Sequence, residues 1–230
     1  MKNNMPMRLT FRAVIARLQK FYGNPHPPTV TDPFEQVLWE NVAYLVDDEK
    51  RACAFSELRK TVGTSPEDIL KAKPEKLLAI TRMGGMVPEL RTQRLRQSAE
   101  LVKILLKGDL DAALSQSLAH AKKTLRRFPT IGEPGAEKIL MFAGRYPVLG
   151  LESNGLRVLL RFGFAHEQKS YSASYRAIQK ALAGQLPEDC ASLTRAHQLL
   201  RKHGQGLCKR SQPRCDECPL QNDCAFAAQL

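Results

Sequence analysis

Four cysteines within the last 23 residues constrain this chain more than any other feature. Their spacing is C-x6-C-x2-C-x5-C, and they are Cys208, Cys215, Cys218 and Cys224. Four thiolates so close in sequence can converge on a single point, and all-thiolate ligation suits either a [4Fe–4S] cluster or a structural Zn²⁺. Zinc ribbons usually use two C-x2-C pairs, and this chain has one. The spacing therefore favours iron–sulfur over zinc, and over four unrelated structural cysteines.

Composition and the N-terminal sequence indicate where such a chain works. Its 230 residues are enough for one large or two small domains with real cores. No apolar run approaches the ~20 residues that span a membrane, and residues 1–10 lack the apolar region of a signal peptide. We expect a cytoplasmic protein, nucleoid-associated in a bacterial cell, in which clustered cysteines bind metal. Cys53 and Cys190, far from the cluster, are expected to be small core residues.

The net charge is +12, from 35 basic and 23 acidic residues. Such an excess favours a polyanionic partner, and nucleic acid is the usual one. Lys122, Lys123, Arg126 and Arg127 lead up to a turn, and a second basic group lies inside the cysteine loop. Either group alone could be an ordinary solvated surface.

Helical periodicity runs along almost the whole chain. Asp32 is expected to cap a helix that has Pro33 at its first position and Glu35 closing a capping box. Ser65 begins a second helix with the same chemistry. Because no alternating strand pattern of useful length appears, the sequence predicts an all-α fold of short helices joined by Gly- and Pro-containing turns.

The most informative turn is Phe128–Gly135, which joins a helix ending near Arg127 to one starting near Pro134. A tight hairpin before a helix N-terminus exposes backbone N–H groups that, with the helix dipole, form a phosphate site. Such a helix-hairpin-helix grips the DNA backbone without reading bases. An ordinary αα-hairpin is the alternative. The residues expected to contact DNA here are Arg127, Thr130, Ile131, Gly132 and Gly135.

Three motifs together resemble those of one enzyme family. The hairpin, the segment Leu151–Val158 and the cysteine pattern have the order and spacing found in endonuclease III and adenine DNA glycosylase. These enzymes belong to the helix-hairpin-helix (HhH-GPD) superfamily of base-excision DNA glycosylases. Asp32-Pro33-Phe34-Glu35 also resembles the first barrel helix of that family, so the resemblance covers nearly the whole chain.

The resemblance implies a fold and an activity. Residues 32–132 would form a six-helix barrel ending in the hairpin, and residues 1–31 with 133–230 would form the iron–sulfur domain, with its cluster loop at 208–224. It implies a monomer that binds double-stranded DNA, flips out a damaged or mismatched base and cleaves its N-glycosidic bond. The cluster would order a loop whose basic residues contact phosphates: Lys209, Arg210 and Arg214.

Two positions of the hairpin depart from the family pattern. Thr130 replaces a glycine, and Pro134 stands where bifunctional members carry the lysine that forms a Schiff base with the sugar. Proline cannot be a nucleophile, so lyase chemistry by that route is absent. Lys138 lies one turn further along the same helix, where it is a weak candidate for that role and otherwise a surface residue.

The essential family aspartate, which stabilises the oxocarbenium-like sugar and guides the water, aligns with Glu152. The carboxylate is retained with one extra methylene. Alternatively, Glu152 is only a helix cap. Asn154 replaces a histidine common in the motif, whereas Arg157 and Val158 match it.

A further stretch, Tyr44-Leu45-Val46-Asp47, aligns with a family segment whose glutamine fills the gap left by the flipped base. Leu45 is either an apolar wedge of the kind that minor-groove benders use or the last core residue of its helix, and we favour the core. Trp39 and Tyr44 either stack on an extruded base or belong to that core.

We therefore predict a monofunctional DNA N-glycosylase that leaves an intact abasic site. The main rival is a catalytically inactive homologue that binds damaged or distorted DNA. A third, weaker interpretation is a four-cysteine zinc module that binds RNA.

Overall fold

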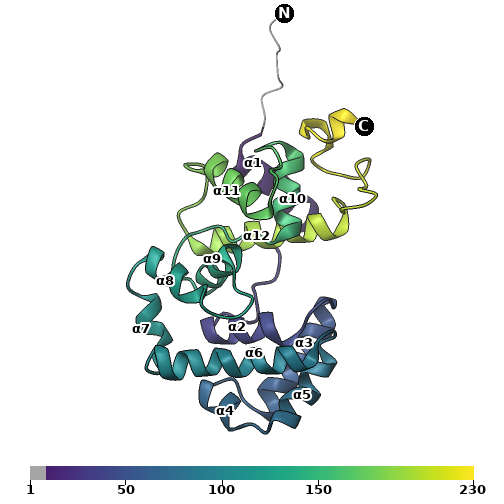
Figure 1. The fold of residues 1–230 in the computed structure, drawn as a ribbon. Coiled ribbons are helices and arrows are strands. Elements are labelled where there is room, and N and C mark those ends of the chain that lie inside the picture. Colours follow the sequence, from purple (N-terminus) through teal and green to yellow (C-terminus); the bar gives the residue numbers. More distant parts are fainter. Residues whose placement is uncertain (1–8) are drawn as a thin grey trace, which may run out of the picture. The chain divides into compact units, whose positions relative to one another are not determined.

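The computed structural model describes residues 9–230, and this part of the chain is built from α-helices with short 3₁₀ and π segments. Its described residues contain no strand, only an isolated bridge between Tyr44 and Gly85. The predicted all-α class is confirmed. The chain forms two compact units (Figure 1). We call Thr29–Arg145 the central unit, and the segment up to Pro28 together with Tyr146–Leu230 the terminal unit.

The central unit is organised around α6 (Pro88–Glu100), which η1 (Leu101–Leu105) continues. In Figure 1, α6 lies along α2 on one side and contacts α4 and α5 on the other. The apolar faces of these helices supply a core that includes Val37, Leu38, Leu58, Leu77 and Leu95. The helices of the unit are α2 (Pro33–Val42), α3 (Asp48–Thr61), α4 (Pro66–Lys71), α5 (Pro74–Met83), α6 (Pro88–Glu100), η1 (Leu101–Leu105), α7 (Leu110–Leu114), α8 (Leu118–Leu125) and α9 (Glu133–Phe142).

Local start signals explain where two of these helices begin. The Ser65 hydroxyl accepts from the Asp68 N–H at 3.1 Å, and the Asp68 carboxylate accepts from the Ser65 N–H at 3.2 Å, so the predicted capping box is present. Asp32 accepts from the Glu35 N–H at 2.8 Å, as expected. The prediction that Glu35 closes a second box is wrong, because its carboxylate instead accepts from Arg59 and Thr64 on neighbouring segments.

The end of α2 is held by a buried arginine. Arg91, on α6, is only 1% exposed. Its guanidinium donates to the carbonyls of Val42, Gly85 and Met86, which join the end of α2 to the turn before α6. Gly84 lies in the same turn, where a Cβ would be 2.2 Å from the Val42 carbonyl oxygen. This turn therefore has its position set by contacts distant in sequence.

We expect Arg91→Met to lower the free energy of unfolding of the central unit by about 3 kcal/mol, since three carbonyls, of which that of Val42 is buried, lose their donor. Urea denaturation followed by circular dichroism measures this loss. Arg82→Met is the matched control, because Arg82 is an exposed arginine just before the same turn. Equal stability of the two variants would contradict the anchoring role.

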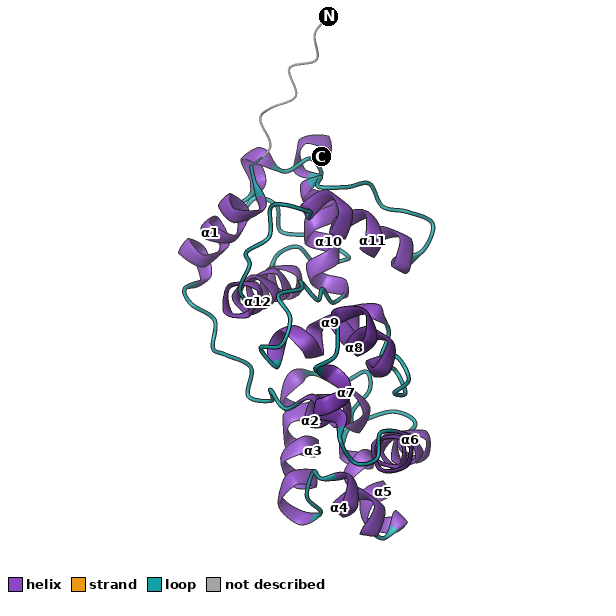
Figure 2. Ribbon diagram, turned by 90° about the vertical axis from the view of Figure 1, so that its left-hand side faces the viewer, coloured by secondary structure: helices purple, strands orange, loops and turns teal. Residues whose placement is uncertain are grey.

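The terminal unit is built on α12, which packs against α10 and α1 (Figure 2). Phe11, Val14 and Leu18 form the buried stripe of α1, and Leu199 and Leu200 lie in the core on α12. Gly204 allows α12 to approach the start of α10 closely, since a Cβ there would lie 2.7 Å from the Asn154 carbonyl oxygen. The helices are α1 (Phe11–Tyr22), α10 (Ser153–Phe162), α11 (Tyr171–Leu182), α12 (Cys190–Gly206), η2 (Gln221–Asp223) and η3 (Ala227–Gln229).

The compact units divide at a different place from the predicted domain boundary at residue 132. The central unit runs on to Arg145 and so includes α9. Contacts of α9 with α2 explain the difference: the Gln36 amide donates to the Ile139 carbonyl at 3.5 Å, and Lys138 pairs with Glu40. Among the described helices, none has the length and apolar character needed to cross a membrane.

Candidate functional site

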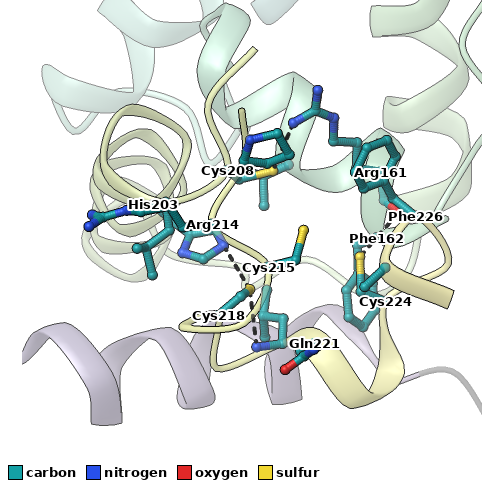
Figure 3. A pocket seen from close by; sticks show the side chains of 15 residues that line it. Arg161, Phe162, His203, Cys208, Arg214, Cys215, Cys218, Gln221, Cys224 and Phe226 are labelled. Carbon is teal, nitrogen blue, oxygen red and sulfur yellow. Dashed lines mark hydrogen bonds between the residues drawn. The ribbon is translucent and has the colours of Figure 1, made fainter. Parts of the chain in front are cut away.

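The four C-terminal cysteines line one pocket of the terminal unit (Figure 3). Cys208 follows the end of α12, Cys215 and Cys218 lie on one tight turn closed by a 3.2 Å bond from the Cys218 N–H to the Cys215 carbonyl, and Cys224 follows η2. Apolar side chains complete the wall: Val158, Phe162, Leu207, Leu220 and Phe226. The loop thus gathers the four thiols around a largely apolar space.

The cysteines do not converge on a single point, and that expectation is wrong. Within residues 9–230, no group of three or more His, Cys, Asp or Glu side chains is close enough to hold one metal ion. All six cysteines are free thiols. A single Zn²⁺ holds its thiolates about 2.3 Å from a common centre, which this arrangement lacks.

Burial disfavours the thiolate form of two of these cysteines. It raises the pKa of Cys218 to about 11, chiefly by desolvation of the thiolate, and it also raises the pKa of Cys215. Four thiolates in an apolar pocket therefore need a positive partner, and metal binding releases their protons. Desolvation likewise lowers the pKa of the neighbouring His203 to about 4, so its imidazole is neutral.

Arg161 holds the basic segment of the cysteine loop. Its guanidinium donates to the Lys209 carbonyl at 2.6 Å and to the Arg210 carbonyl at 2.9 Å, and it lies 4.5 Å from the centre of the Phe226 ring. It also approaches Cys208 Sγ at 3.6 Å. The predicted DNA-contacting side chains Lys209, Arg210 and Arg214 are all exposed on this loop.

Glu152 caps α10. Its Oε1 accepts from the Gly155 N–H at 2.6 Å, and its Oε2 accepts from the Asn154 amide at 2.7 Å. The side chain is half-buried. Nearby, the Tyr171 hydroxyl donates to the Leu151 carbonyl at 3.3 Å. Desolvation, and to a smaller extent the negative charge of Glu152, raises the pKa of Tyr171 to about 12. The carboxylate is thus fixed by its neighbours and has acceptor positions to spare.

A hydrogen-bond network connects Glu152 to the cysteine loop. Asn154, which donates to Glu152, accepts from Arg157 at 2.8 Å. Arg157 donates in turn to the carbonyls of Gly204, at 2.8 Å, and Cys208, at 2.9 Å. The sequence indicated Asn154 and Arg157 as motif positions but not this link, because residues 204 and 208 come together with them only through the packing of α12 on α10.

The hairpin before α9 contains a non-glycine residue in the left-handed region. Thr130 has φ +66°, and its single hydroxyl hydrogen has two acceptors within reach, the Pro129 carbonyl at 2.6 Å and Asn41 Oδ1 at 3.2 Å. The fully buried Asn41 also donates to the Pro129 carbonyl. Thr130, Gly132 and Arg127 are exposed, Gly135 is half-buried, and Ile131 is buried. Ile131 therefore contributes packing and its backbone rather than a surface side chain.

Two lysines near the hairpin are paired with carboxylates. Lys122 forms ion pairs with Glu133, at 2.9 Å, and with Glu137. Lys138 Nζ lies 2.6 Å from Glu40 Oε1, and its side chain is only 19% exposed. The expectation that Lys138 is a surface residue is wrong, because α9 packs on α2. An ammonium group held against a carboxylate is a poor nucleophile.

Leu45 lies outside the core. Because α2 ends at Val42, Leu45 follows it in a loop with φ +54° and is 70% exposed. The prediction of a core residue is therefore wrong. The adjacent Tyr44 is half-exposed and pairs with Gly85, next to the exposed Met86 and the left-handed Val87. We call Tyr44, Leu45, Met86 and Val87 the apolar rim. Sequence reasoning missed Met86 and Val87, although the double glycine before them marked the turn.

The other sequence-predicted residues have structural surroundings. Trp39 packs edge-on against Phe55, with ring centres 5.3 Å apart, in keeping with the core alternative. Cys53 is exposed and Cys190 is partly exposed, so neither is the core residue expected. Cys53 lies on the side of α3 opposite Phe55 and Leu58, the residues that this helix buries.

Comparisons with known proteins identify the fold. No protein-family model matches the chain. Solved structures with the same fold include a trapped endonuclease III–DNA covalent intermediate (TM-score 0.76, 18% identity, 96% of this chain and 98% of the other) and a thermostable thymine-DNA glycosylase (TM-score 0.75, 15% identity, 96% and 97%). The fold is that of the helix-hairpin-helix DNA glycosylases.

Comparison by sequence finds relatives that are named endonuclease III. Endonuclease III of Thermotoga maritima is 26% identical over 196 residues, which is 85% of this chain and 84% of that protein. Endonuclease III of Escherichia coli is 22% identical over 220 residues, 94% of this chain and 95% of its own. The chain is thus endonuclease III-like in both sequence and fold, and the resemblance predicted from its motifs is confirmed.

Proposed function

We propose that this protein is a monofunctional DNA N-glycosylase that removes a damaged or mismatched base from double-stranded DNA. The observation that carries the proposal is the Glu152 carboxylate, fixed at the start of α10 by Gly155 and Asn154. A carboxylate accepts at about four positions, and the two hydrogen bonds of Glu152 leave room for a water and for the sugar. This geometry supports catalysis without demanding it, since the same bonds also cap the helix.

In the proposed reaction, Glu152 acts on the sugar. Its charge stabilises the oxocarbenium-like transition state that forms as the N-glycosidic bond breaks. It also accepts a proton from the attacking water, as a general base. The products are a free base and an intact abasic site.

The absence of lyase chemistry rests on Pro134 and Lys138. Pro134 has no amine that could attack C1′, and Lys138 is engaged with Glu40. Hydrolysis by water is therefore the route that the residues favour.

We propose that two kinds of surface bind DNA: exposed polar and basic residues that contact phosphates, and apolar side chains that insert between bases. The exposed hairpin residues Arg127, Thr130 and Gly132 would contact phosphates, as would the basic cysteine loop. The apolar rim would insert beside the extruded base, as apolar side chains of minor-groove benders do. Leu45 and Val87 hold left-handed backbone conformations, which often mark functional segments.

We assign the four-cysteine pocket to a [4Fe–4S] cluster. Each thiolate of such a cluster binds a different iron, and the four thiols that line this pocket supply that number of ligands. The cluster would order the loop that carries Lys209, Arg210 and Arg214, and it would take no part in bond cleavage.

A catalytically inactive DNA-binding protein is the second candidate. One observation favours it: both oxygens of Glu152 already have partners within α10. This candidate and the glycosylase share every DNA contact and differ only in turnover.

Single-turnover cleavage of labelled duplexes tests the proposal. The panel contains uracil, oxidised pyrimidines, 8-oxoguanine opposite C and A, G:T mismatches, alkylated purines and an abasic site. We expect strand breaks with at least one lesion, only after alkali, and no covalent complex when borohydride is added. An endonuclease III, a protein for which a DNA covalent intermediate has been trapped, is the positive control.

Breaks without alkali, trapped by borohydride, would contradict the monofunctional assignment and turn attention to Lys138. Tight binding with no cleavage of any duplex would favour the inactive candidate.

A further inference from the structure

One cysteine of the pocket receives two hydrogen-bond donors. The Leu220 N–H lies 3.4 Å from Cys218 Sγ, and Nε2 of His203 lies 3.5 Å from the same sulfur. The other ring nitrogen of His203, Nδ1, lies 3.0 Å from the Tyr22 hydroxyl. Figure 3 shows His203 pointing from α12 toward Cys218. Three segments (α1, α12 and the cysteine loop that follows α12) therefore meet in one chain of contacts.

The chemistry of a metal-bound thiolate determines the direction of these bonds. A thiolate has no proton, so it can only accept, and Nε2 must carry the hydrogen. In a neutral imidazole, Nδ1 is then the acceptor. The Tyr22 hydroxyl therefore donates to Nδ1, and His203 donates to Cys218.

The surroundings favour a fixed relay rather than a mobile contact. His203 is only 1% exposed, and its ring packs edge-on against Tyr22, with centres 5.9 Å apart. Tyr22 is also covered by Lys202, whose ammonium lies 5.1 Å from the ring centre.

We propose that Tyr22 and His203 form a hydrogen-bond relay that raises the reduction potential of the cluster bound at Cys218. The inference rests on the proposed [4Fe–4S] site. Reduction adds one electron, whose charge spreads over the cluster and its thiolate sulfurs. A donor to sulfur stabilises the more negative reduced state, and such bonds are among the features that set the potential of iron–sulfur proteins. His203 acts here as a positioning and tuning residue, not a ligand.

Four variants of the full-length protein test the relay by redox titration, followed through the visible absorption of the cluster. His203→Leu removes the donor to Cys218. His203→Gln replaces the imidazole with an amide that can still donate. Tyr22→Phe removes the group that holds the tautomer. His197→Leu is the matched control, because His197 is another buried histidine of α12 and contacts the Gly150 carbonyl instead of a cysteine.

We expect a more negative potential for His203→Leu, a smaller shift in the same direction for Tyr22→Phe, and values near that of the unsubstituted protein for His203→Gln and His197→Leu. An unchanged potential in a His203→Leu protein that retains its cluster would overturn the relay. If His203→Leu loses the cluster, Tyr22→Phe decides in the same way, since it alters one hydroxyl.

Failure of the cluster assignment has a different signature. An unsubstituted protein that contains stoichiometric zinc and no visible absorption would overturn both the cluster and the relay. The glycosylase proposal would then still stand or fall on the cleavage panel.

Discussion

The Glu152→Gln substitution is expected to reduce single-turnover base excision by about 10³-fold or more while changing the Kd for distorted duplex less than about threefold. The negative charge opposite the developing cation disappears, whereas the size of the side chain and the DNA-binding surfaces remain. Excision of the lesion identified by the cleavage panel measures the first effect, and fluorescence anisotropy with the same duplex measures the second.

The local geometry predicts a modest structural cost that needs a control. The new amide oxygen can still accept from the Gly155 N–H, but the amide nitrogen then faces the Asn154 amide, which is itself a donor. The Asn154 amide cannot flip without losing the hydrogen bond that it accepts from Arg157. Asp189→Asn is the matched control, because Asp189 caps α12 of the same unit by accepting from the Ser192 N–H at 2.7 Å.

The outcomes separate catalysis from capping. If both substitutions lower Tm but only Glu152→Gln removes activity, the carboxylate acts in the reaction. Glu152→Asp adds a check, since it keeps the charge and shifts it by about one methylene, so it should retain more activity than Glu152→Gln. Near-normal excision by Glu152→Gln would contradict the catalytic role and leave Glu152 as a cap.

Much of the fold could be predicted because its signals are local. Asp32 and Ser65 mark helix starts by bonds to N–H groups three residues away, and the structure has both. The hairpin and the C-x2-C turn are likewise short-range features, and both occur where expected. Motif order then connected these features to a known fold, which the comparisons support.

The failures have non-local causes. Periodicity continued α2 to Leu45, but Arg91 binds the Val42 carbonyl and the Tyr44 N–H donates to Gly84, so the helix ends earlier. Lys138 was expected on the surface. Its pairing could not be predicted from local sequence, because its partner Glu40 lies on another helix. Cys53 was assigned to the core from its residue type, whereas the buried positions of α3 point to the opposite face.

The Cys218→Ser substitution should have the second large effect: loss of iron from the purified protein and loss of order in residues 208–230. A serine hydroxyl is a far weaker ligand for iron than a thiolate. Without the cluster, the apolar pocket has no group that joins its four thiols, and the segment is held by weaker contacts, among them those of Arg161, Arg157 and Arg17. Iron content and limited proteolysis of the C-terminal segment measure the loss. Cys53→Ser is the control, because Cys53 is exposed in the other unit, and it should keep both iron and protease resistance.

The same substitution should weaken DNA binding through charge. Each lysine or arginine on a phosphate contributes about 0.9 to the slope of log K against log salt, so releasing Lys209, Arg210 and Arg214 should reduce the slope by about 2 to 3. A triple alanine substitution of these three residues should reduce the slope equally while keeping the iron, because their side chains lie outside the pocket wall formed by the cysteines, except for part of Arg214. Agreement between the two slopes would mean that the cluster serves DNA binding by ordering this loop. A Cys218→Ser protein that loses iron and keeps the full salt dependence would instead separate the cluster from the DNA interface, and the phosphate grip would then rest on the hairpin of the central unit.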